Sequence, residues 1–186
     1  MAAPRCRNVL LAFAIAAIAG GSGCTGKDSS RPGESLGVFG VSAKLVSSTC
    51  GATPDPWKFD VRLRHEANTL YWVQGAAPIS GQVDAAAHTM LKSSDVHEVR
   101  AADAKSKTAA CKMSRNDVLD LVLAPVVTPV KEVGGVTSFK GTLTYRFAAT
   151  EGSSCEDQLL ETGGDFAAIP CDVKYEVEGQ RTGDAK

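Results

Sequence analysis

The cysteines are the residues of this chain with the most evident chemistry. Six are present: Cys6, Cys24, Cys50, Cys111, Cys155 and Cys171. Redox exchange uses a Cys-x-x-Cys pair, and a structural zinc site uses cysteines or histidines at short, regular spacing. Neither pattern occurs, because even the closest two cysteines are 16 residues apart. The cysteines after residue 24 are therefore predicted to form structural disulfides.

Histidines and carboxylates could provide metal binding or acid–base catalysis. A zinc site could use His65, His88 and His97 with Asp95 or Glu98. However, the first of these histidines continues the outward-facing series of its predicted strand. The other two lie at or near strand ends, where solvated histidines are common. The sequence therefore predicts no metal ion and no cofactor.

The densest polar group of the chain is Arg115, Asn116 and Asp117. The simplest interpretation is a turn or a surface ion pair, which contributes little by itself. The chain contains no nucleophile elbow, phosphate-binding glycine loop, zinc-protease motif or dinucleotide fingerprint. An enzyme is therefore not predicted, and no catalytic residue is assigned.

Aromatic residues could line a ligand cavity, because a barrel of about eight strands has room for one apolar ligand. In a domain of this size, aromatic side chains more often belong to the core. Both interpretations apply to the same candidates, which are Trp57, Tyr71, Trp72, Tyr145 and Tyr175.

The first 23 residues have the three parts of an export signal. Arg5 and Arg7 provide a positive start, and an apolar stretch of eleven residues runs from Val9 to Ala19. A membrane-spanning helix needs about 20 apolar residues. Small residues follow immediately before Cys24. We therefore expect residues 1–23 to be removed.

The small residues followed by Cys24 resemble the lipobox of bacterial lipoproteins, although Gly21 stands where the family usually has leucine. The resemblance implies cleavage before Cys24 and a lipid on its sulfur. Thr25 in the next position resembles sorting to the outer membrane; the alternative is a secreted or periplasmic protein. Residues 24–35 lack large apolar side chains and are predicted to form a lipidated, flexible tether.

Lipidation of Cys24 leaves an even number of cysteines to pair. Sequence alone cannot choose among the three possible pairings. We expect Cys50–Cys111 and Cys155–Cys171. The second pair would close the short, poorly packing stretch 156–170, and the first would fasten the end of the first strand.

From Leu36 onward the apolar residues alternate with polar ones, the period of half-buried strands. The predicted strands include 36–45, 58–64, 70–73, 79–83, 139–147 and 173–177, with short segments at 89–91, 96–99, 109–113 and 118–123. No long helical stripe is visible. Residues 36–182 are therefore predicted to form one all-β domain, an antiparallel β-sandwich or small β-barrel of about nine strands with two disulfides.

Net charge and composition exclude some classes of function. The formal charge is −1 and the charged residues are mixed along the chain, which disfavours nucleic-acid binding. The sequence predicts a membrane-anchored envelope lipoprotein with a β binding or interaction domain, whose partner could be an envelope protein or polysaccharide. The alternatives are a barrel that binds a lipid or other apolar ligand, or an enzyme with an unrecognised site.

Replacing Cys24 tests the lipid anchor. A Cys24→Ser protein should lose labelling by radioactive palmitate and move from the membrane to the soluble fraction, because the acylated sulfur is gone. A variant that stays in the membrane fraction with unchanged mass would show that the anchor is not there.

Overall fold

The computed structural model describes residues 32–75, 77–125 and 135–183, and this part of the chain is all-β. Its eight strands are β1 (Glu34–Ser48), β2 (Trp57–Glu66), β3 (Thr69–Val73), β4 (Ile79–Gln82), β5 (His88–Arg100), β6 (Cys111–Ala124), β7 (Ser138–Ala149) and β8 (Cys171–Gly183). Two short 3-10 turns, η2 (Glu156–Gln158) and η3 (Leu160–Thr162), lie between the last two strands. The predicted all-β class is confirmed.

Two strands are longer than the sequence predicted, so the described residues form eight strands rather than about nine. The segments 89–91 and 96–99 both belong to β5, and the segment 118–123 joins most of 109–113 in β6. Polar residues interrupt the apolar series between these segments, although the backbone alternation continues through them. The sequence also predicts an exposed loop at 128–133, which lies outside the described residues.

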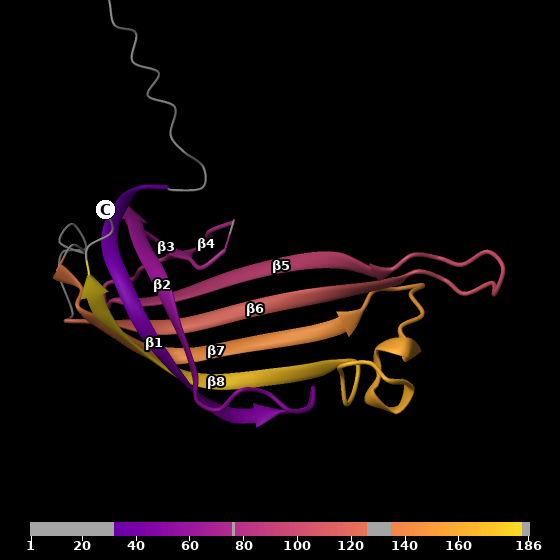
Figure 1. Cartoon of the computed structure of the whole chain (residues 1–186). Helices are drawn as coiled ribbons and strands as arrows, with labels where there is room; N and C mark the ends of the chain where they lie inside the picture. Colours follow the sequence, from indigo (N-terminus) through magenta and orange to yellow (C-terminus); the bar gives the residue numbers. More distant parts are fainter. Residues whose placement is uncertain (1–31, 76, 126–134, 184–186) are drawn as a thin grey trace, which may run out of the picture.

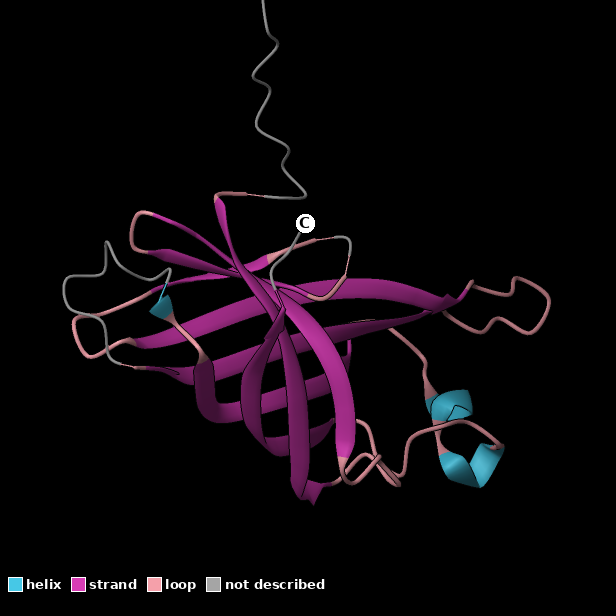
Figure 2. Cartoon of the chain, turned by 60° about the vertical axis from the view of Figure 1, so that its left-hand side comes forward, coloured by secondary structure: helices cyan, strands magenta, loops and turns pink. Residues whose placement is uncertain are grey.

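The strands form one antiparallel sheet that curls almost into a barrel (Figures 1 and 2). Each strand from β1 to β4 and from β5 to β8 pairs with its neighbour in sequence, and β8 pairs with β1. The order across the sheet is β4-β3-β2-β1-β8-β7-β6-β5. Of the two architectures left open by the sequence, the structure therefore has the barrel-like one.

The barrel is incomplete between β4 and β5, and we call this line the β4–β5 seam. Among the described residues, a single bridge from Val83 to Thr89 takes the place of a ladder there. The approach is nevertheless close at Gly81, where an added Cβ would overlap the carbonyl oxygen of Met90. Glycine at this position therefore lets β4 approach the backbone of β5.

The centre of the barrel is filled by aromatic side chains. Phe39 and Phe139 are fully buried and Trp72 is 1% exposed. Their rings pack at 5.7 Å (Phe39–Phe139) and 5.5 Å (Trp72–Phe139). The ring of Phe139 lies over Gly179 on β8, where any Cβ would overlap it. These three aromatic side chains belong to the core. For Trp72, this is one of the two interpretations that the sequence left open.

Unequal strand lengths shape the other end of the molecule. β3 and β4 have 5 and 4 residues, whereas β5 to β8 have 12 to 14. The long strands therefore extend beyond the barrel, as Figure 1 shows. Part of their inward face is covered there by the segment before β8, whose Phe166 and Ile169 pack on Cys111 and Met113.

The two disulfides correct the predicted pairing. Cys50 bonds to Cys171, and Cys111 bonds to Cys155. The predicted pairs Cys50–Cys111 and Cys155–Cys171 are wrong because strand register, rather than closeness in sequence, brings the sulfurs together. Antiparallel pairing places Ser48 opposite Val173 and Met113 opposite Ala149.

The start of the domain is fastened to the barrel. The guanidinium of Arg64 donates to the carbonyl oxygens of Pro32 (2.9 Å) and Gly33 (2.6 Å). β1 begins at Glu34, inside the range predicted as tether. The predicted signal and Cys24 lie outside the described residues. Within the described ranges, no helix has the length and apolar character needed to cross a membrane.

Proteolysis of the unreduced protein distinguishes the pairings. Trypsin leaves Cys155 and Cys171 on one peptide, 147–174, with Cys50 on 45–58 and Cys111 on 108–112. The bonds in the structure should give one species of three joined peptides. After a further cut at Glu161, the piece with Cys171 should remain joined to 45–58 by mass spectrometry.

A peptide 147–174 closed on itself, beside a separate species joining 45–58 to 108–112, would contradict this map. As a control of the bond's role, a Cys111→Ser/Cys155→Ser protein should unfold with a free energy lower by about 2–5 kcal/mol, since the bond closes a loop of 44 residues.

Candidate functional site

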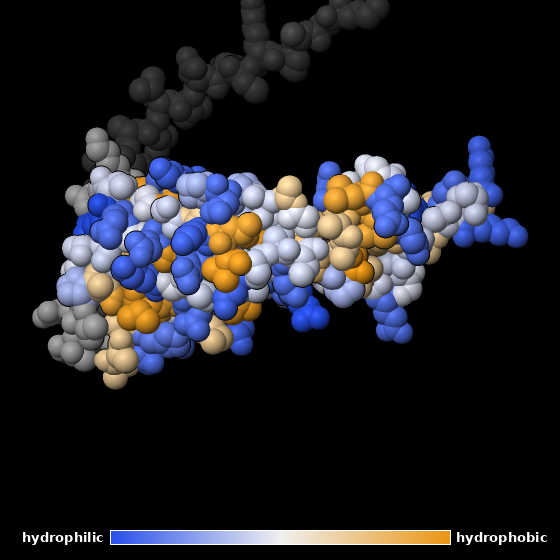
Figure 3. Space-filling model, turned by 90° about the horizontal axis from the view of Figure 1, so that it is seen from below, coloured by the Kyte–Doolittle hydropathy of each residue, from blue (hydrophilic) through white to orange (hydrophobic). Residues whose placement is uncertain are grey.

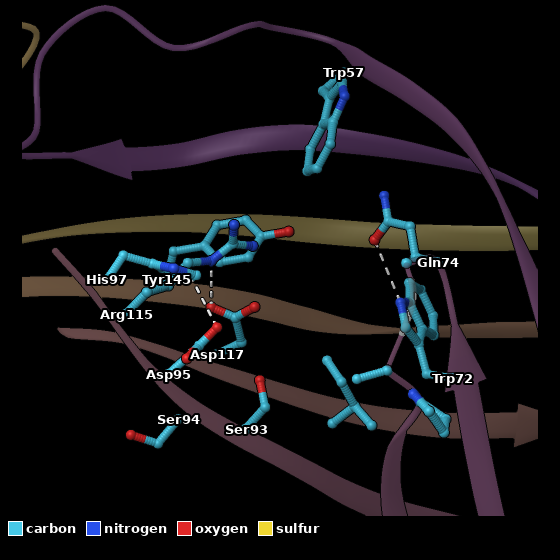
Figure 4. Close-up of a pocket in the computed structure, with 14 residues that line it drawn as sticks. Trp57, Trp72, Gln74, Ser93, Ser94, Asp95, His97, Arg115, Asp117 and Tyr145 are labelled. Atoms are coloured by element: carbon cyan, nitrogen blue, oxygen red, sulfur yellow. Dashed lines mark hydrogen bonds and ion pairs between the residues drawn. The ribbon is translucent and has the colours of Figure 1, made fainter. Parts of the chain in front are cut away.

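A cleft of about 700 Å³ opens beside the connection from β3 to β4. The longer strands β5 to β7 continue past this connection. Figure 4 shows its side chains pointing toward one another from several strands. One wall is apolar and consists mainly of Trp57, Trp72, Pro78 and Ile79. The opposite wall is polar and comes from β5, and the floor comes from β6 and β7. The volume lies within the range of small-molecule sites.

The apolar wall includes both tryptophans of the chain. Trp57 is half-buried and its ring packs 4.3 Å from Phe59 and 6.2 Å from Tyr145. Trp72 is buried, and its indole N–H donates to Oε1 of Gln74 at 3.4 Å. Packing therefore holds both rings in place, while Trp57 keeps part of its surface toward solvent.

The floor is formed by Arg115, Asp117 and Tyr145. Nε of Arg115 donates to Oδ1 of Asp117 at 2.8 Å, and the guanidinium carbon lies 4.5 Å from the centre of the Tyr145 ring. All three residues occupy inward-facing positions, because odd-numbered residues of β6 and β7 point into the barrel. The predicted turn or surface ion pair is instead a pair in the middle of a strand with a buried carboxylate.

Burial and charge change the pKa values of this group. Burial, partly opposed by the charge of Arg115, raises the pKa of the Tyr145 hydroxyl well above its usual value near 10. Burial by itself would lower the pKa of Arg115. The hydrogen bond and charge of Asp117 outweigh that effect and raise it. The floor is therefore a fixed cation and a neutral phenol at physiological pH.

Asp117 has unused hydrogen-bonding capacity toward the cleft. Its residue is 8% exposed and its Oδ1 accepts from Arg115. A carboxylate has about four acceptor positions. Among the described residues, Arg115 is the single hydrogen-bond donor to this side chain. Oδ2 of Asp117 is not among the buried side-chain atoms without a partner, so it reaches the solvent of the cleft, where a ligand donor can bind it.

The polar wall consists of residues at inward-facing positions of β5. Ser93, Asp95 and His97 follow the buried Thr89 and Leu91 at every second residue. Nε2 of His97 lies 2.8 Å from Oδ2 of Asp95. Both side chains are largely exposed because β4 does not reach this part of β5.

The far end of β5 is fixed by Arg100. Its guanidinium donates to Oδ2 of Asp157 at 2.8 Å, to the carbonyl oxygen of Ser154 at 2.6 Å and to that of Ala109 at 3.0 Å. The Cys111–Cys155 bond fastens the same segment to β6. The outer half of the polar wall is therefore tied down at a point where the barrel no longer supports it.

The histidines considered as metal ligands lie apart. Nε2 of His65 is 3.8 Å from Oε2 of Glu34. Nε2 of His88 is 2.6 Å from Oδ1 of Asp120 on the outer face of β6. That hydrogen bond, opposed by desolvation, raises the pKa of His88. The pair therefore stabilises the fold below pH 6.5 and loses its effect as the pH rises through the raised pKa. No group of three potential metal ligands occurs in the described part of the chain.

The remaining aromatic candidates divide between core and surface. Tyr175 is buried, and its hydroxyl donates to the carbonyl oxygen of Pro54 at 3.2 Å. Tyr71 is half-buried on the opposite face of β3 from Trp72. Sequence reasoning did not identify Gln74, Ile79 or Ser93 as site residues, because they reach the cleft from three separate places: just after β3, at the start of β4 and in the middle of β5.

Alkaline titration tests the burial of Tyr145. Because its pKa is raised, Tyr145 should stay protonated near pH 10, and a Tyr145→Phe protein should show the same increase in absorbance at 295 nm around that pH. At higher pH the folded protein should lose stability, since the unfolded chain ionises this phenol more readily. A Tyr145→Phe protein that lacks one phenol transition near pH 10 would contradict the buried geometry.

Comparison with known proteins identifies no relative from which a function could be inferred. The chain matches no protein-family model, no curated protein and no solved structure. The arrangement of a tryptophan wall, a buried Asp117 and a polar strand is therefore the observation from which a function can be inferred.

Proposed function

We propose that this protein is an envelope lipoprotein, anchored through Cys24, whose β domain binds a small ligand or an exposed group of a partner in the cleft. The observation that carries the proposal is the cleft itself, which combines fixed aromatic rings with a buried, incompletely hydrogen-bonded carboxylate. Binding sites for small molecules typically have this combination of apolar surface and a few placed polar groups.

The barrel interior supports this location over the alternative of an apolar ligand enclosed within the strands. Phe39, Phe139 and Trp72 pack against one another where such a ligand would lie. The cleft differs because it opens to solvent and has charged residues on two sides. A ligand with both apolar and polar surface suits it better than a lipid chain.

The anchor would hold the start of β1 within reach of the bilayer. Pro32, where the described domain begins, is eight positions after Cys24. A fully extended chain of that length spans at most about 28 Å. On the face of the domain seen in Figure 3, apolar side chains form separate patches with polar residues between them. The outer membrane is our proposed location, with a secreted or periplasmic protein as the alternative.

The two tryptophans make the proposed site testable without a known ligand. Both lie in the cleft, so their indole N–H signals report on it alone. We expect members of a general fragment library, added to the mature Cys24→Ser chain labelled with ¹⁵N, to shift both indole signals. The same fragments should have little effect on a Trp57→Leu protein and an undiminished effect on Tyr71→Leu.

Fragments that shift only residues on the outer face, such as Val122 or Glu178, would contradict the proposal. A library in which no compound shifts either indole signal would contradict it as well, because a preformed site of this volume binds some fragments weakly.

A further inference from the structure

The charges of the cleft restrict the ligands it can bind. By formal charge, Arg115 contributes one positive charge to the cleft and Asp95 and Asp117 contribute two negative charges, so the formal sum of these three residues is negative. One N–H group of the guanidinium is engaged with Asp117, and an anionic ligand at its other N–H groups would lie close to that carboxylate. The net charge of the cleft therefore disfavours phosphate and carboxylate groups.

A cationic ligand is disfavoured by the position of Arg115. The guanidinium lies over the face of Tyr145 and beside Asp117, which are the places a ligand cation would occupy for ring and charge contacts. A ligand ammonium next to Asp117 would have to approach this guanidinium at close range. The geometry thus leaves Asp117 as an acceptor for neutral donors.

The polar groups form a closely spaced set of both donors and acceptors. Asp117 has spare acceptor positions, the hydroxyl of Ser93 donates and accepts, and the amide nitrogen of Gln74 can donate while its oxygen binds Trp72. Neutral hydroxyl groups on a ligand can satisfy both kinds. Hydrogen bonds to a charged partner such as Asp117 are the stronger ones.

The opposite wall requires an apolar surface on the same ligand. Trp57 faces the polar strand across the cleft, and its side chain is only half-buried. A purely apolar ligand would remove water from Asp95 and Ser93 without replacing their hydrogen bonds, which is costly. A ring with hydroxyls at its edge and C–H groups on its face satisfies both walls.

We infer that the cleft binds a neutral saccharide, with one sugar ring lying against Trp57 and its hydroxyls donating to Asp117. This inference rests on the proposed binding function and adds the chemical class of the ligand. Neutral here includes N-acetylated sugars, whose amide is uncharged. Ser93 of β5 and Gln74 contact the other hydroxyls of the ring.

Titration with a chemically sorted panel tests the inference. The panel contains neutral oligosaccharides (glucans, mannans, galactans and N-acetylated glucosamine oligomers), an acidic oligosaccharide, the polyamine spermidine and palmitate. Binding to the mature Cys24→Ser chain is measured by tryptophan fluorescence and calorimetry. At least one neutral oligosaccharide should bind, and the other probes should not.

Matched variants locate the bound sugar. Asp117→Asn should weaken its binding at least about tenfold, since a charge-assisted hydrogen bond becomes a neutral one. Asp120→Asn makes the same change three residues further along β6 on the outer face and should alter binding less than about twofold. Trp57→Ala should abolish the fluorescence response and weaken the calorimetric binding, whereas Tyr71→Ala should do neither. Thermal unfolding of each variant checks that it remains folded.

The outcomes separate the ligand class from the binding function. If spermidine, palmitate or the acidic oligosaccharide binds in a Trp57-dependent way and no neutral sugar does, the saccharide inference fails while the cleft remains a binding site. If a neutral sugar binds equally well to Asp117→Asn and Trp57→Ala, both the inference and the assignment of the cleft fail. If no neutral sugar binds, the inference is overturned.

Discussion

The difference in length between β4 and the strands beside it is the constraint from which the rest of this structure follows. Four residues of β4 meet a β5 of 13 residues, so the barrel closes at one end only. Pro78 immediately precedes β4 and cannot donate a backbone hydrogen bond. Beyond that point the inward faces of β5 and β6 need another cover, and the cleft forms where they have none.

A sheet that extends past its own barrel needs other means to stay in place. The Cys111–Cys155 bond and the hydrogen bonds of Arg100 tie the ends of β5 and β6 to the segment before β8. The Cys50–Cys171 bond joins the ends of β1 and β8 at the side of the barrel. These bonds reduce the freedom that a ligand would otherwise have to remove on binding.

The alternation of apolar and polar residues was enough to predict the all-β class, the antiparallel pattern and most strand positions, because one face of each strand is buried. Disulfide pairing was not predictable in this way, since it depends on the register between β1 and β8, which are far apart in sequence. The polar site was misread for a related reason. Arg115 and Asp117 are separated from the inward-facing Leu119 by an even number of positions, so they lie on the same face of β6. This spacing could have identified them as facing the barrel.

The buried carboxylate of Asp117, which is paired with the exposed Arg115, is not explained by the stability of the fold. Removing a carboxylate from water is costly, and an apolar residue of similar size at an inward position is often equally stabilising. Leu119, Leu121 and Leu123 show that the same face of β6 accepts such residues. The polar residues begin on both β5 and β6 at the level where the cleft opens. A ligand that hydrogen-bonds there would account for a pair that packing alone does not require.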